Sequence, residues 1–129
     1  MHEISATAGT GVHTVTVTGL LLGADLCLAF GGGTNAHIGA VALATPRPSL
    51  EDKARISASS SVLCVIGHKE DLLARALSLK AATCLNCRVS VSVGLHIDGA
   101  DKNDIDLLQE NCNAALDLLI IKLEQTKKE

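Results

Sequence analysis

The sequence has almost no aromatic residues. Phe30 is the only aromatic side chain among 129 residues, and both Trp and Tyr are absent. Proteins that bind single-stranded nucleic acids combine a basic groove with aromatic side chains that stack on the bases. Here the eleven basic residues form no stripe and the net charge is −3, so we exclude nucleic acid as a partner. Leu, Val, Ile and Ala must fill the core, because apolar residues still make up 47% of the chain.

Signals for export and for membrane insertion are also missing. The first residues lack the charged-then-apolar pattern of a signal peptide, and the unbroken apolar runs are too short to span a bilayer. Five cysteines are an odd number, which indicates free thiols in a reducing compartment. We therefore expect a single cytoplasmic domain that occupies residues 1–129 and has no membrane segment.

Hydrophobic periodicity predicts a two-layer α+β protein. Alternating or β-branched runs predict strands, and apolar residues at helical spacing predict helices. The expected strands cover residues 12–22, 25–30, 37–44, 56–66 and 88–97, and the expected helices cover residues 67–83 and the chain from 101 onward. This order, β-β-β-β-α-β-α, predicts a five-stranded mixed sheet with both helices on one face. The other face is rich in Ser, Thr, Gly and Ala and should meet a ligand, solvent or another subunit.

The last helix carries more apolar surface than one sheet requires. It begins at an approximate capping box formed by Asp101 and Asp104. Its expected buried stripe consists of Ile105, Leu108, Cys112, Ala115 and Leu119, and a second apolar flank consists of Leu107, Ala114, Leu118 and Ile121. Either this helix is deeply buried, or the flank contacts another subunit. We expect a homodimer through this helix or through the uncovered sheet face.

Strand directions bring four of the five histidines to one end of the sheet. If the first four strands are antiparallel neighbours and the fifth runs parallel to the fourth, His13, His37, His68 and His96 share that end. His2 is the exception, in a terminus that we expect to be frayed. Imidazoles from separate strand ends suit a divalent metal with an open position, held by His37, His68 and His96. Asp98 would orient an imidazole. The alternative is that each histidine is an ordinary strand-end residue.

An anion site is a second interpretation of the same end. The run Gly31-Gly32-Gly33 should form a tight loop whose backbone N–H groups, with Asn35, offer donors to a phosphate. Lys69 and Arg47 supply cations, and the helix that begins near His68 points its positive end there. The glycine run lacks any established phosphate-binding spacing, so the alternative is a simple turn.

Two further features give no active site. Cys84 and Cys87 form a CxxC pair that follows a helix, whereas redox pairs lie at a helix start, so we interpret them as free thiols. No nucleophile-elbow sequence is present, and we assign no catalytic residue.

Three segments resemble the LpdD-like family. They are residues 31–49, with the sequence GGGTNAHIGAVALATPRPS, residues 67–71 (GHKED) and residues 94–98 (GLHID). The resemblance covers nearly the whole chain. It implies a chaperone or maturation factor that binds prenylated flavin mononucleotide, with His37, His68 and His96 as ligands. It also implies a UbiD-type decarboxylase or a flavin prenyltransferase as partner. The lack of aromatic residues departs from what flavin stacking favours.

Two other functions fit the same residues. A small metal-dependent enzyme would use the three histidines and a bound water, with Asp98 as general acid or base. A structural subunit of a decarboxylase complex would use the apolar flank of the last helix and would not need the histidines.

Overall fold

The computed structural model describes residues 2–65 and 70–128, in which alternating apolar and small polar residues form the strands of one mixed sheet. The strands are β1 (His2–Ala8), β2 (Val15–Leu22), β3 (Asp25–Gly33), β4 (Ala40–Pro48), β5 (Ile56–Cys64) and β6 (Val89–His96). The helices are α1 (Asp71–Leu85) and α2 (Lys102–Lys128), and a short 3₁₀ helix, η1 (Gly11–His13), precedes β2.

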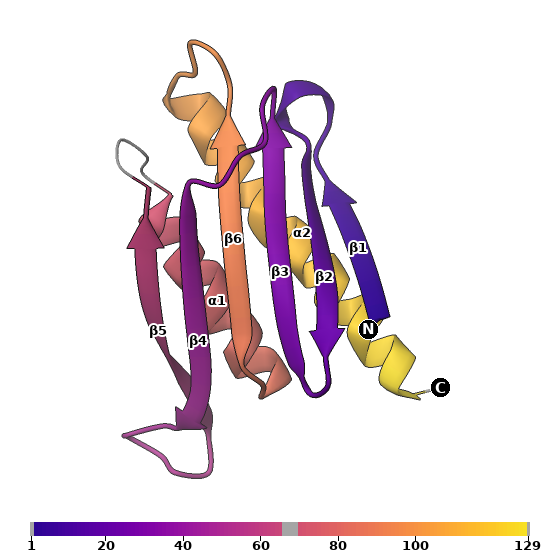
Figure 1. The fold of residues 1–129 in the computed structure, drawn as a ribbon, viewed down its shortest axis with the longest axis vertical. Coiled ribbons are helices and arrows are strands. Elements are labelled where there is room, and N and C mark those ends of the chain that lie inside the picture. Colours follow the sequence, from indigo (N-terminus) through magenta and orange to yellow (C-terminus); the bar gives the residue numbers. More distant parts are fainter. Residues whose placement is uncertain (1, 66–69, 129) are drawn as a thin grey trace.

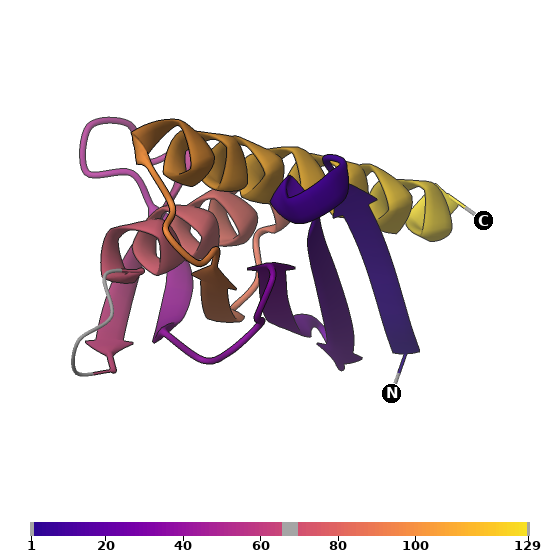
Figure 2. The same ribbon diagram turned by 90° about the horizontal axis from the view of Figure 1, so that it is seen from above.

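Both helices cover the same face of the sheet, as predicted, and the other face has no covering layer within the described chain (Figure 2). The core lies between the two layers and consists of aliphatic side chains around Phe30, which is 3% exposed. The helices contribute Leu77 of α1 and Leu116 and Leu119 of α2 to this core, and all three are fully buried. In the described residues, no helix combines the length and the apolar character needed to cross a membrane.

The apolar stripe of α2 is only partly as expected. Leu108, Cys112, Ala115 and Leu119 are buried, but Ile105 is 48% exposed, so its assignment to the core is wrong. The second flank faces away from the sheet, since Leu118 and Ile121 are 44% and 50% exposed. Deep burial of α2 therefore does not explain that flank.

The sheet contains six strands in the order β1-β2-β3-β6-β4-β5, which corrects the expected five-stranded arrangement (Figure 1). The added strand, β1, pairs antiparallel with β2 and carries His2, so this terminus is not frayed. Two hydroxyl pairs across these strands, Ser5–Thr18 and Thr7–Thr16, each lie 3.0 Å apart. The threonines Thr16 and Thr18 belong to the alternating pattern that predicts β2. Their partner strand, β1, was not predicted from the sequence.

β6 lies between β3 and β4, which were expected to be neighbours. It pairs parallel with β3 and antiparallel with β4. The reason is burial: Val89, Val91 and Val93 are all fully buried, so β6 is more stable in the middle of the sheet than at its edge. β5 becomes the edge strand. It still runs parallel to β6, as expected, but it does not pair with it.

Strand boundaries also differ around proline and glycine. The expected end of the third strand at Ala44 is wrong, because β4 continues to Pro48. β4 pairs with β6 only as far as Ala44. Beyond that point β4 has no neighbouring strand on the β6 side, so the two prolines, which have no N–H group, break no hydrogen bond there. The glycine run is not a loop either; it forms the last residues of β3.

Replacing Leu116 by Ala should lower the free energy of unfolding by about 2–5 kcal/mol, because the side chain is fully buried between α2 and the sheet. Chemical denaturation of both proteins measures this difference. Leu50→Ala is the matched control, since Leu50 is 89% exposed and its truncation should change stability by less than about 0.5 kcal/mol. Equal losses in the two variants would contradict the assignment of this core.

Candidate functional site

Three of the described histidines lie at one end of the sheet. β2 and β4 begin at this end, and β3 and β6 finish there, because Gly33 pairs with His96 and Ala40 pairs with Val93. His13 precedes β2, and His37 precedes β4. The position of β6 between β3 and β4 differs from the expected strand order, but the strand directions are as expected, so the histidines still share one end. His68 and Lys69 lie outside the described residues.

The connection from β3 to β4 crosses the uncovered face of β6 (Figures 1 and 2). Two glycines allow this close passage. A Cβ atom at Gly94 would overlap the backbone carbonyl of His37, and one at Gly31 would lie 2.9 Å from the Cβ of Ala36. The connection is tied down by the N–H of Thr34, which donates to the carbonyl oxygen of His96 over 2.7 Å. His37 is thereby fixed beside the end of β6.

Glu70 is the partner of His37, and sequence reasoning missed it. The residue sits at the N-cap of α1 but makes no side-chain cap there. Instead its Oε1 accepts from Nε2 of His37 over 3.1 Å and from the backbone N–H of Leu95 at 3.5 Å. Gly39 provides the room, since a Cβ there would meet the carboxylate. The available signal was an acidic residue at the start of a helix, which the helix dipole explained equally well.

Both ring nitrogens of His37 face acceptors. Nε2 donates to Glu70, and Nδ1 lies 3.3 Å from the carbonyl oxygen of Asn35. Neither acceptor has a proton to give, so a protonated ring nitrogen of His37 can donate to either of them. The same N–H can donate to an anionic or carbonyl-bearing ligand that replaces one of these acceptors.

His13 and His96 have carboxylate partners of their own. Nε2 of His96 lies 2.8 Å from Oδ1 of Asp98, the contact expected of Asp98 as an orienting residue. Nε2 of His13 lies 2.8 Å from Oδ1 of Asp104, at the start of α2. Asp104 also forms the capping box: its N–H donates to Asp101 over 2.9 Å, and the N–H of Asp101 donates back over 3.0 Å. His13 thus links η1 to the first turn of α2.

The expected phosphate cradle has a different structure. The N–H groups of Gly33, Thr34 and Asn35 donate to backbone carbonyls, at 3.3, 2.7 and 3.4 Å. Gly31 and Gly32 belong to the ladder between β2 and β3, so the glycines serve close strand packing. Arg47 lies at the opposite end of β4, where its Nε donates to Ser59 over 2.9 Å. Its expected position near the histidines is therefore wrong.

The described residues contain no group of three His, Cys, Asp or Glu side chains that could hold a metal ion. His37 and His96 are instead each paired with a carboxylate. Of the three expected ligands, His68 is the one whose position is not described.

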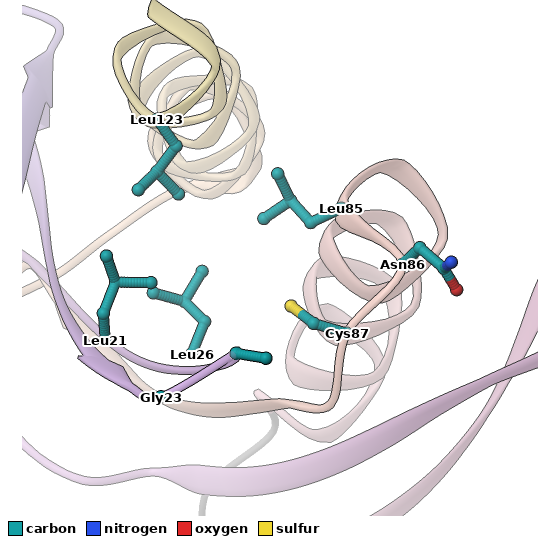
Figure 3. A pocket seen from close by; sticks show the side chains of 8 residues that line it. Leu21, Gly23, Leu26, Leu85, Asn86, Cys87 and Leu123 are labelled. Carbon is teal, nitrogen blue, oxygen red and sulfur yellow. The ribbon is translucent and has the colours of Figure 1, made fainter. Parts of the chain in front are cut away.

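An apolar cleft of about 280 Å³ lies at the other end of the molecule (Figure 3). Four leucines converge on it from β2, β3 and the ends of both helices, and the sulfur of Cys87 points toward them, while Asn86 points away. The lining residues are Leu21, Gly23, Ala24, Leu26, Leu85, Asn86, Cys87 and Leu123. Without a charged side chain and at this size, the cleft does not suit a flavin phosphate.

None of the five cysteines forms a disulfide, as the sequence predicts. Cys112 is buried in the core, and burial raises the pKa of its thiol to about 12, so this residue is inert at neutral pH. Cys84 lies in the last turn of α1 and is exposed.

Comparison with known proteins agrees with this fold and supplies the family. Residues 9–124 match the prenylated flavin chaperone LpdD-like domain, which leaves only β1 and the chain ends outside the match. The chain belongs to the LpdD-like family. Among curated proteins, no sequence matches it.

The fold of this LpdD-like chain also occurs in a solved structure. A chain of a chaperone complex for yeast 20S proteasome assembly superposes with a TM-score of 0.51 and 7% identity, covering 90% of this chain and 99% of that one. At this identity the likeness concerns the fold alone.

The capping box makes stability depend on acid pH. The hydrogen bond from His13, followed by the backbone N–H of Asp101, holds the pKa of Asp104 below its ordinary value of 3.8. A carboxyl with a lowered pKa in the folded state stabilises the fold above its unfolded pKa and loses that effect as pH falls through the folded one. Asp104→Asn should therefore be less stable than wild type at neutral pH, with a gap that closes below pH 3.8. Urea unfolding over this range measures the gap. Glu110→Gln, an exposed carboxylate of α2, should show no such convergence.

Proposed function

We propose that this protein binds prenylated flavin mononucleotide and delivers it to a decarboxylase. Membership of a prenylated flavin chaperone family is the observation that carries the proposal. Once delivered, the flavin supplies the decarboxylation chemistry in the partner enzyme. The chaperone itself needs only to bind and release it, which agrees with a chain in which we assign no catalytic nucleophile.

The binding site of this proposal is the histidine end of the sheet. His37 presents an imidazole whose nitrogens both face acceptors, and His96 is 48% exposed in its side chain. Such donors suit the carbonyl oxygens and phosphate of a flavin nucleotide. The connection above β6 places its backbone, with Asn35, at the same end. Arg47 is too far along β4 to take part, and Lys69 remains a candidate cation.

A divalent metal is a narrower part of the proposal and depends on His68. His96, whose Nε2 contacts Asp98, has the carboxylate–imidazole arrangement often found around metals. His37 joins as a ligand only if one of its nitrogens leaves its present acceptor. A metal would add a Lewis acid beside the flavin, and the described side chains alone do not hold one.

The partners follow from the same family. We propose that a UbiD-type decarboxylase receives the flavin, that a flavin prenyltransferase supplies it, and that all three act in the cytoplasm. We also propose that the chaperone is a homodimer. Its exposed apolar side chains, among them Leu43 at 54% and Leu63 at 79%, favour self-association over an isolated monomer.

Glu70→Gln tests the site. The protein should be purified anaerobically from cells that contain a flavin prenyltransferase, and the bound flavin measured by its absorption spectrum. Replacing the carboxylate removes a charge-assisted bond to His37 and should weaken flavin binding about 10- to 100-fold. The matched control is Asp71→Asn. Asp71 is the first residue of α1 and is exposed, so this variant should retain the flavin.

Transfer is measured by adding the loaded chaperone to a flavin-free UbiD-type decarboxylase and following decarboxylation. Wild type should restore activity, and Glu70→Gln should restore less at equal protein concentration. A wild-type protein that never retains flavin, but still raises the activity of the assembled enzyme, would contradict the chaperone and favour a structural subunit. Metal analysis of the same samples, beside His68→Ala, decides whether a metal accompanies the flavin.

A further inference from the structure

The face of the sheet away from the helices carries no charged side chain in the middle of its strands. We define the open face by the side chains of β2, β3, β6, β4 and β5 that alternate with the buried ones. They are Thr16, Thr18, Leu20, Cys27, Ala29, Ser90, Ser92, Val41, Leu43, Thr45, Ser59, Ser61 and Leu63. A solvated sheet face normally carries charged residues among its polar ones. Here the charged side chains lie at the margins. They are Glu3 on β1, Asp25 at the first position of β3, where it pairs with Arg88 over 3.0 Å, and Arg47 near the end of β4.

Large and small side chains are separated on the open face. Two cross-strand rows run over β3, β6, β4 and β5 in register: Ala29, Ser92, Val41, Leu63 and Cys27, Ser90, Leu43, Ser61. The β3 and β6 positions are small and form a shallow trough. The β4 and β5 positions include the large side chains, and Val41, Leu43 and Leu63 are 36%, 54% and 79% exposed. These three form an apolar ridge beside the trough.

We propose that a second copy of this chain docks on the open face, so that two sheets pack face to face with the helices outside. The ridge and the trough lie on one face, so this face is complementary to the same face of another copy. Each ridge enters the partner's trough, and the match occurs twice, as an interface between identical surfaces requires. Sheets packed in this way are about 10 Å apart.

The size of the open face agrees with a stable dimer. Five strands about 4.8 Å apart and roughly seven residues long at about 3.4 Å per residue give a flat area of about 570 Å². Side chains corrugate this surface, so the accessible area approaches the roughly 800 Å² per partner of a standard interface. Because the middle of the face is uncharged, burial of that part leaves no unpaired ion there. The inference rests on the homodimer proposed above and not on the flavin.

Leu43→Asp tests the face against Leu118→Asp, a control with similar exposure on α2. Light scattering and sedimentation across a concentration series measure the dissociation constant. Wild type and Leu118→Asp should be dimers. Leu43→Asp places a carboxylate on the ridge of both copies and should raise the dissociation constant at least about 100-fold. Far-ultraviolet circular dichroism establishes that each variant is folded.

A second measurement needs no variant. Cys27 lies in the trough and Cys84 on α1, so a dimer should protect Cys27 from alkylation as protein concentration rises, while Cys84 reacts at a constant rate. Peptide mapping reports both thiols in one sample. A wild-type monomer at all concentrations would overturn both the face and the homodimer. A dimer that survives Leu43→Asp, or that leaves Cys27 reactive, would overturn the face alone. Loss of the dimer in Leu118→Asp would move the interface to α2. Flavin retention is scored separately and decides the chaperone proposal whatever the assembly state.

Discussion

The histidine end depends on how closely the β3–β4 connection passes over the end of β6. Gly94 leaves no side chain beneath the backbone of His37, and Gly31 leaves room for Ala36. Because this connection leaves the plane of the sheet, β4 pairs with β6 only from Ala40 onward. The N–H of Leu95 then has no strand partner on that side. Glu70 takes that place and binds His37 with the same carboxylate. Two missing Cβ atoms thus determine where the imidazole and its acid meet.

The same logic explains why separate elements share one end. β5 enters α1 beside β4, and β6 enters α2 beside β3, so the helix starts lie at the end where His37 and His13 precede their strands. Each helix start contributes a carboxylate to one of these histidines: Glu70 for His37 and Asp104 for His13. Acidic residues at helix N-termini are favoured by the helix dipole alone. Here their side chains also join the sheet layer to the helix layer.

Sequence patterns predict both helices, every strand except β1, the covered face and the strand directions, because these follow from local periodicity and from the handedness of crossovers. They failed where the outcome depends on distant partners. The place of β6 is decided by the burial of three valines between β3 and β4, and β1 is recognisable through its hydroxyl pairs with β2. The histidines can be grouped from the strand directions alone. The role of Glu70 cannot, because it depends on the pairing of β4 with β6 ending at Val93, before Leu95. Arg47 was expected near the histidines, but it lies at the opposite end of β4, because the strand continues past Ala44 to Pro48.

The open face and the histidine end are continuous, and this has an energetic consequence. Ala36 and His37 lie on the open face above Gly31 and Gly94, so a second copy on that face would approach the connection that positions His37. Ile38 in this connection is 61% exposed and lies at the margin of the same surface. In the proposed dimer, any ligand that shifts the connection would then change the free energy of dimerisation. Linkage requires dimerisation to change the affinity for that ligand by the same factor. A chaperone that must first hold and then release its cargo can use such coupling, since contact with a partner that disturbs the proposed dimer would also change the affinity of the site.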